Sequence, residues 1–313
     1  MIDPAWLNPA IAFCVGVLLA FTMRKVFARI QSRRGPLVWL PKRWHYINRS
    51  KVLQPVYDIL KLLSKQTIIP ATATPFFVLG PLLALGFAVL LPLFIPVAGQ
   101  AFDYEFSLVI VFYLLIGVIM AVIVGGTASA SLFAAIGGVR EIELMLANEI
   151  PFILGSFALA IWYGTLSVQA MTGPNLLLNP FAAAAFFIAM LVKLHVKPFD
   201  IAEAESEIVG GLTTEYSGKL LGILEITKVV MLFSLAALFV DLFLWVPQGW
   251  ALPGVAAWAL FLAGIFVVSV ALGTVHALFA RFRIDQATRW LFTVSTALGI
   301  IALLWSVAWR FVL

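Results

Sequence analysis

The part of the sequence with the most potential chemistry is an acid-rich stretch, HVKPFDIAEAESEIVGGLTTEYSG, at residues 195–218. Five of the chain's fifteen acidic residues lie within it: Asp200, Glu203, Glu205, Glu207 and Glu215. Carboxylates that lie near one another raise each other's pKa and can exchange protons near neutral pH. Long apolar runs flank the stretch at 181–194 and 220–240. We therefore expect it at a membrane surface.

The conformation of this stretch has two interpretations. Acidic runs are usually solvated loops, and that interpretation stays open here. Three glycines let the backbone turn tightly and Pro198 sets its entry angle, which favours a shaped loop instead. Tyr216 adds a hydrogen-bonding group beside Glu215. We expect a structured central loop at about 197–218.

Charged residues also lie inside or at the edges of the apolar runs. Glu225 and Lys228 are three residues apart and share one helix face. They form either a structural pair within the helix or part of a charge pathway; the pathway is favoured, because a charge near the bilayer centre costs at least about 2.5 kcal/mol. Glu149 lies about one and a half turns into a predicted span and could also reach the interface. His276 and Arg310 end their spans and need no function, since long or amphipathic side chains reach the interface there.

Together these residues predict an ion pathway from the inner surface to the middle of the membrane, which indicates proton or sodium movement. A channel is less favoured, because no filter-like segment is evident on the outer side. The candidate pathway residues are Glu141, Glu143, Glu149, Glu203, Glu205, Glu207, Glu215, Glu225 and Lys228.

The composition excludes a soluble globular protein. Hydrophobic residues make up 63% of the chain and charged residues 11%, whereas globular chains have about 25% charged residues. Several apolar runs reach the roughly 20 residues that cross a bilayer, and the alternating segments of a transmembrane barrel are absent. The predicted fold is an all-α polytopic membrane protein, with residues 1–313 as a single domain. Eight spans are predicted: 6–23, 76–97, 106–125, 144–163, 181–197, 219–244, 255–276 and 289–311.

The basic residues predict how the chain lies in the membrane. Eleven of its twenty Lys and Arg residues fall between Arg24 and Lys65. Three other loops contain none: 98–105, 164–180 and 245–254. The basic loops are therefore expected in the cytoplasm and both termini outside. Residues 51–66 are amphipathic and too short and polar to span, so they predict a helix in the interface plane. The net charge of +5 thus favours lipid headgroups as partners over nucleic acid.

The sequence offers little to bind a metal or to carry electrons. Cys14 is the only cysteine, so the chain has no cysteine cluster for iron–sulfur ligation. The three histidines are far apart and form no recognisable ligand motif. We expect no metal, no cofactor and no catalytic residue in this chain, so that any electron transfer takes place in another subunit.

Three motifs resemble one known family. They are KPFDIAEAESEIVGG…EYSG at 197–218, ARIQSRRGP at 28–36 and AAIGGVREIELMLANEIP at 134–151. The chain resembles the membrane subunit known as subunit 1 in respiratory complex I, together with its relatives in membrane-bound nickel–iron hydrogenases and formate hydrogenlyases. The resemblance covers most of the chain.

This resemblance implies a subunit of the prokaryotic plasma membrane that anchors a peripheral redox arm. The implied partners are hydrogenase-like large and small subunits, which would hold the nickel–iron centre and the iron–sulfur clusters, and antiporter-like membrane subunits. By the same resemblance, Glu141 and Glu149 lead into the membrane axis. The residues implied in docking the arm are Arg33, Arg34, Asp200, Glu203 and Tyr216.

The details of the motifs favour one branch of the family. Arg140 followed directly by Glu141, and KPFDIAEAE at 197–205, look more like the hydrogenase and formate hydrogenlyase branch. Lys228 stands where complex I members tend to carry glutamate, and the insertion at 38–50 departs from their pattern. The favoured hypothesis is the ion-translocating anchor subunit of a hydrogenase-type complex.

Two other hypotheses remain. The alternative is the quinone-site subunit of a complex I-like NADH or ferredoxin dehydrogenase, which requires a tunnel between the first helix, the amphipathic helix and the sixth span. A free-standing secondary transporter is disfavoured, because the sequence shows no inverted repeats and the acidic loop would be idle without a docked partner.

Overall fold

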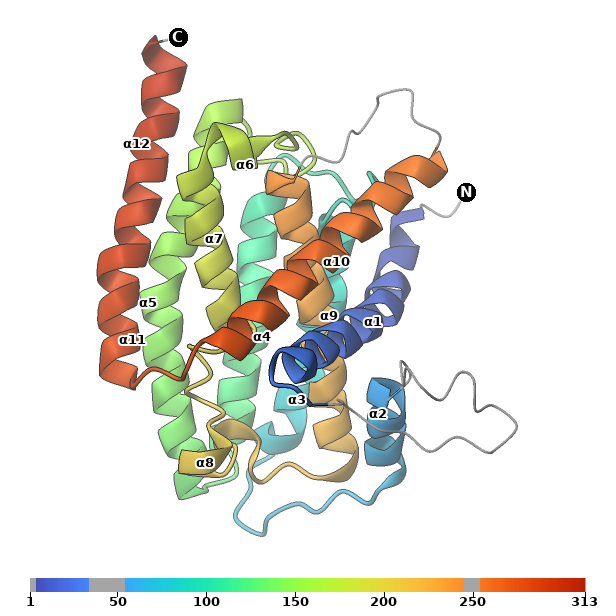
Figure 1. Ribbon diagram of the computed structural model, residues 1–313. Helices are drawn as coiled ribbons and strands as arrows, with labels where there is room; N and C mark the ends of the chain where they lie inside the picture. Colours follow the sequence, from blue (N-terminus) through green and yellow to red (C-terminus); the bar gives the residue numbers. More distant parts are fainter. Residues whose placement is uncertain (1–3, 34–53, 245–253, 313) are drawn as a thin grey trace.

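The computed structural model describes residues 4–33, 54–244 and 254–312, and within them the chain is helical, with no named strand. Figure 1 shows a bundle of long helices, with α1 and α10 tilted across one side. The long helices are α1 (Asn8–Ile30), α3 (Phe76–Phe94), α4 (Ser107–Thr127), α5 (Leu132–Tyr163), α7 (Pro180–Lys193), α9 (Gly218–Phe243), α10 (Gly254–Leu278) and α12 (Thr296–Val312). The shorter elements are η1 (Pro4–Leu7), α2 (Gln54–Ser64), α6 (Asn175–Leu178), α8 (Glu205–Ile208), η4 (Gly211–Thr213), α11 (Ile284–Trp290) and the π turn η5 (Leu291–Ser295).

The described helices agree with the predicted all-α polytopic fold. Seven of them are long and apolar enough to cross a membrane: Ala5–Ile30, Phe76–Phe94, Ser107–Thr127, Leu132–Tyr163, Gly218–Phe243, Gly254–Leu278 and Ile284–Arg310. Pro180–Lys193, where the remaining span was predicted, is also apolar but shorter. The last span is built from α11, η5 and α12 as one continuous rod. The described ends of the chain point toward the end of the bundle opposite the central loop (Figure 1).

Several predicted boundaries differ from the structure: α1 ends at Ile30 instead of residue 23, the last rod begins at Ile284 instead of residue 289, and two further differences bear on the central loop. Helix α5 begins at Leu132 instead of residue 144, because the preceding small-residue segment continues the helix and packs on the central loop. A Cβ on Gly137 would lie 2.9 Å from the backbone of Gly211. Helix α7 ends at Lys193 instead of residue 197, since His195 has a positive φ of 49°.

Helix α9 forms the centre of the bundle, with 78% of its most apolar window buried. It packs against α1, α2, α3, α7 and α10. Gly16 allows α1 to approach closely, because a Cβ there would lie 2.5 Å from the carbonyl oxygen of Val229. The short amphipathic helix α2 lies within the predicted range 51–66, of which residues 51–53 are outside the described part. Its Ile59 is buried with Val17 of α1 and Val229 of α9.

The central loop is shaped and packed against the bundle. Gly210 and Gly211 have positive φ angles of 97° and 56°, which other residues rarely adopt. Leu212, between the second glycine and α9, is buried against α4. Tyr216 stacks on Phe77 at 4.4 Å between ring centroids and donates a hydrogen bond to the Phe77 carbonyl at 3.1 Å. These contacts favour the shaped loop over the solvated one.

Candidate functional site

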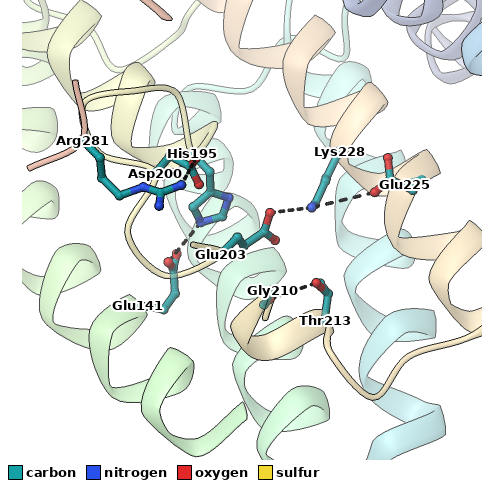
Figure 2. Close-up of polar contacts among 9 residues, drawn as sticks. All are labelled: Glu141, His195, Asp200, Glu203, Gly210, Thr213, Glu225, Lys228 and Arg281. Atoms are coloured by element: carbon teal, nitrogen blue, oxygen red, sulfur yellow. Dashed lines mark hydrogen bonds and ion pairs between the residues drawn. The ribbon is translucent and has the colours of Figure 1, made fainter. Parts of the chain in front are cut away.

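The acidic residues of the central loop pair with cations from three other elements. Asp200 accepts from Arg281, which follows α10, at 2.8 Å, and Glu203 accepts from Lys228 of α9 at 2.6 Å. Glu207 accepts from Arg140 of α5 at 2.8 Å. Figure 2 shows the first two of these pairs on either side of His195. Cations from three separate parts of the chain thus hold the loop's carboxylates in place.

Lys228 links the central loop to α9. Its Nζ lies 2.6 Å from Glu203 and 3.9 Å from Glu225, one turn away in the same helix. The shorter contact is the one that reaches across the fold, as Figure 2 shows. The Glu225–Lys228 pair is therefore part of a larger cluster and not an isolated pair within one helix.

His195 adds a histidine to the cluster. Its Nε2 lies 3.0 Å from Glu141 Oε2 of α5. Burial lowers the pKa of His195, but the negative charges of Glu141 and Glu203 outweigh this effect and raise the pKa to about 9. Burial raises the pKa of Glu203. The positive charges of Lys228 and His195 lower it by more, so the pKa of Glu203 lies below its usual value. Near neutral pH the site therefore contains an imidazolium between two carboxylates.

A second ion pair lies deeper in the bundle. Lys193, at the end of α7, donates to Glu149 Oε1 of α5. The Lys193 side chain is 1% exposed and that of Glu149 14%, and the ammonium lies 4.6 Å from the centre of the Phe152 ring. Because α5 begins at Leu132, Glu149 lies well inside its helix. Lys193 pairs with one oxygen of this carboxylate inside the protein, so Glu149 does not need to reach the interface.

A cavity of about 470 Å³ is lined by some of these groups. Its apolar walls come from α1, α2, α4 and α9, and Arg24 and Asp58, which pair at 3.2 Å, line it between α1 and α2. The charged residues of its inner lining are Glu141, Lys193, His195, Glu203, Glu225 and Lys228. The cavity lies between the first helix, the amphipathic helix and the sixth span, where the quinone-site hypothesis requires a tunnel.

Comparison with known proteins identifies the family. A family model described as NADH dehydrogenase matches residues 6–307. The chain belongs to the complex I subunit 1 family. The NADH-quinone oxidoreductase subunit of this family from Geobacillus thermodenitrificans (strain NG80-2) is 32% identical over 327 residues, which cover 95% of this chain and 94% of the relative. For the corresponding subunit of Geobacillus kaustophilus (strain HTA426) the values are 32% over 328 residues, 95% and 93%.

A solved structure supports the same assignment. A chain of the membrane-bound sulfane sulfur reductase, an archaeal respiratory membrane complex, matches with a TM-score of 0.85 and 29% sequence identity. The match covers 96% of this chain and 98% of that chain. The family resemblance that the three motifs predicted is thus confirmed.

The remaining predicted residues of this complex I subunit 1 homologue lie in varied surroundings. Glu143, Glu207 and Arg33 are exposed, and Glu215 is partly buried. Tyr216 is 4% exposed, so its hydroxyl is used within the fold to position the loop. The side chain of Glu205 and the whole of Arg34 lie outside the described residues, as does the insertion at 38–50.

Sequence reasoning missed four charged residues that the fold uses. Lys193, His195 and Arg281 each pair with an acid that the sequence did single out. The signal was present, because each lies at the inner end of an apolar run, where a carboxylate also has to be neutralised. Asp241 is fully buried in α9, and neither of its carboxylate oxygens has a hydrogen-bond partner among the described residues. It lies at the end of an apolar run in the sequence, so nothing distinguished it from an ordinary helix terminus.

Proposed function

We propose that this chain is the membrane anchor and ion-translocation subunit of a hydrogenase-type complex, of the formate hydrogenlyase or energy-converting hydrogenase class, in a prokaryotic plasma membrane. Its central loop docks a peripheral arm of hydrogenase-like large and small subunits, and antiporter-like subunits adjoin it in the membrane. The arm holds the iron–sulfur clusters and the nickel–iron centre. The chain couples electron transfer in the arm to the movement of protons or sodium ions.

The observation that carries this proposal is the series of ion pairs from the loop into the bundle. It begins at the exposed pair of Arg140 and Glu207 and continues through Glu141 and His195. Lys228 and Glu203 extend it along the cavity, and Lys193 and Glu149 end it inside the membrane part. Charges in a medium of low dielectric constant act strongly on one another. A charge change at a cluster docked on the loop would therefore alter the pairing of these groups and with it their protonation.

The test is the Glu149→Gln variant in the purified complex. Gln keeps the size of the side chain but cannot ionise, so we expect ion pumping in proteoliposomes to be lost while dye-linked hydrogenase activity of the partner subunits survives. Glu105→Gln, in the exposed loop between α3 and α4, is the matched control and should pump normally. Pumping by Glu149→Gln at the wild-type rate would remove this residue from the pathway and contradict the proposal.

The cavity favours a second candidate function, quinone binding in a complex I-like dehydrogenase. Its volume of about 470 Å³ falls within the roughly 300–1,000 Å³ of small-molecule sites, and it combines apolar walls with a charged end, as an amphipathic quinone requires. Solvent extraction of the purified complex distinguishes the two functions. About one quinone per complex, displaced when Ile59→Trp fills the cavity wall, would support this candidate, whereas an active complex without quinone supports the hydrogenase-type function.

A further inference from the structure

A groove lies between the C-terminal ends of α5 and α12 and the start of α4. Its volume is about 360 Å³, and it shares no lining residue with the cavity beside the central loop. The described end of α12 lies at the end of the bundle opposite α8 and the central loop (Figure 1). Arg310, which lines the groove, is the last residue of the candidate span Ile284–Arg310. The groove therefore lies at the depth of the membrane interface, on the side away from the central loop.

The Arg310 guanidinium is held in place at the mouth of this groove. Its Nη1 donates to the Ile161 carbonyl at 2.5 Å, one of the last carbonyls of α5, which have no partner within the helix. Gly164, with a φ of 70°, leaves room for the guanidinium, since a Cβ there would lie 3.0 Å from Nη2. The side chain is exposed and makes no other hydrogen bond among the described residues. Its remaining N–H donors form a planar fork that suits a phosphate.

The groove also contains a carboxylate. Glu105 lines it, is exposed, and has no hydrogen bond or ion pair among the described residues, not even with Arg310. A place at the end of a span explains a charged side chain, and capping of α5 explains one hydrogen bond of Arg310. Neither explains two opposite charges that line one groove without pairing. A ligand that carries both a negative and a positive group does.

The other walls of the groove are apolar and reach deeper into the membrane. Phe157 lies on α5 about two turns, or roughly 10 Å, before Gly164, and Phe106 is 56% exposed. Trp162 and Trp309, next to the groove in sequence, stack with 5.1 Å between ring centroids. Tryptophan is enriched at the level of lipid headgroups. The charged end of the groove is thus level with the headgroups and its apolar walls with the acyl chains.

We propose that this groove binds a phospholipid with a zwitterionic amine headgroup, such as phosphatidylethanolamine, from the leaflet opposite the central loop. The lipid phosphate accepts hydrogen bonds from Arg310, the ammonium lies toward Glu105, and an acyl chain runs along Phe157. The inference goes beyond the proposed function and does not depend on it, because the groove shares no residue with the ion pairs of the site. A purely anionic headgroup would be repelled by Glu105, and a choline headgroup has no N–H to donate.

The first test is a cryo-EM structure of the intact complex in nanodiscs of phosphatidylethanolamine and, separately, of phosphatidylglycerol. In the first we expect a lipid in the groove, with its phosphate at hydrogen-bond distance from the Arg310 guanidinium. In the second we expect no ordered headgroup there. A helix of a partner subunit in the groove, an empty groove in phosphatidylethanolamine, or an ordered headgroup in both nanodiscs would overturn the proposal.

The second test is a titration of the delipidated complex with dioctanoyl phosphatidylethanolamine, followed by native mass spectrometry. Arg310→Gln should raise the Kd about tenfold or more, because charge-assisted hydrogen bonds to the phosphate are lost. Arg310→Lys, which keeps the charge but not the planar fork, should bind with an intermediate Kd. The dioctanoyl lipids with choline and glycerol headgroups should bind the wild type more weakly than the ethanolamine lipid.

Arg289→Gln is the matched control for this titration. Arg289 is also exposed and lies near the other end of the same rod, so its variant should bind with the wild-type Kd. An unchanged Kd for Arg310→Gln, an equal rise for Arg289→Gln, or equal binding of the three headgroups would overturn the proposal. The proposed function would remain untouched by these results, since neither test measures ion movement or docking of the arm.

Discussion

At the scale of residues, the charges of this protein are compensated in pairs across the fold. Removing one partner of a buried pair leaves an uncompensated charge, which costs about 3–5 kcal/mol. We expect the full cost for Lys193 and Glu149, whose side chains are only 1% and 14% exposed. It is smaller for Lys228, whose side chain is 40% exposed. The deeper pair is therefore expected to contribute to stability as well as to ion movement.

His195 makes stability depend on pH in a defined window. Its pKa is raised from 6.5 to about 9 in the folded protein, so the folded state keeps a proton that the unfolded state loses above pH 6.5. The stabilisation is fully present below pH 6.5 and is lost as the pH rises to about 9; the shift corresponds to an order of about 3 kcal/mol at most. We expect the difference in Tm between wild type and His195→Gln to shrink from pH 6 to pH 9.5.

A second histidine provides the control for this measurement. His276 Nδ1 accepts a hydrogen bond from the backbone N–H of Lys197 at 3.3 Å, a role that a neutral imidazole fulfils. His276→Gln should therefore shift Tm by a similar amount across the same pH range. If the Tm curves of wild type and His195→Gln ran parallel, His195 would not be an imidazolium in the folded protein.

The sequence revealed the acids of the site but not their partners. Glu149 and Glu225 are conspicuous in apolar runs, because every charge in a bilayer requires an explanation. Which cation reaches which acid depends on helix packing: Lys228 selects Glu203, 25 residues away, over Glu225 in its own helix. Asp200 pairs with a residue 81 positions away. Spacing along a helix cannot predict such pairs.

At the scale of elements, hydropathy located every span but not every end. A run of apolar residues indicates which segment crosses the membrane, whereas a helix end depends on local backbone contacts. Helix α5 extends to Leu132 because Gly137 and Gly138 allow it to pack on the central loop and on α4. The hydropathy of that extension is that of a surface helix, so the sequence placed it outside the span.

Close packing of α3 on α4 depends on two facing glycines, Gly80 and Gly125. A Cβ on Gly80 would lie 2.5 Å from Gly125 Cα and 2.8 Å from the Ala121 carbonyl oxygen, so the two helices would have to separate. We expect Gly80→Ala to destabilise the protein by about 1–3 kcal/mol, as overpacking does. The measurement is thermal unfolding in detergent, followed by the loss of helical circular dichroism.

Another glycine of the same helix is the matched control. A Cβ on Gly86 would have no neighbour within 4 Å, and alanine favours a helix by up to about 1 kcal/mol over glycine. Gly86→Ala should therefore leave Tm unchanged or raise it. Equal losses of stability in both variants would show that backbone freedom, and not the contact between α3 and α4, explains the glycine at position 80.

At the scale of the whole molecule, the ion pairs named above lie toward one end of the bundle. The end with the central loop holds Glu143 and Glu207 on its surface, both exposed. The opposite end has exposed acids too, at Asp103 and Glu105, but Asp103 accepts a hydrogen bond from Ser167 at 2.5 Å. Under the proposed function, only the end with the central loop docks the redox arm. Reversing exposed acids at this end should therefore weaken docking, whereas reversing an exposed acid at the opposite end should not.

Reversing the exposed acids at the central loop should weaken docking of the arm. In the double variant Glu143→Lys and Glu207→Lys, two negative charges become positive, and Arg140 loses its carboxylate partner. We expect less of the iron–sulfur subunit to co-purify with a tagged chain at 50 mM salt, and a smaller difference from wild type at 500 mM, because salt screens exposed charges. Glu105→Lys at the opposite end should leave co-purification unchanged. An equal yield from the double variant at both salt concentrations would mean that the arm docks elsewhere.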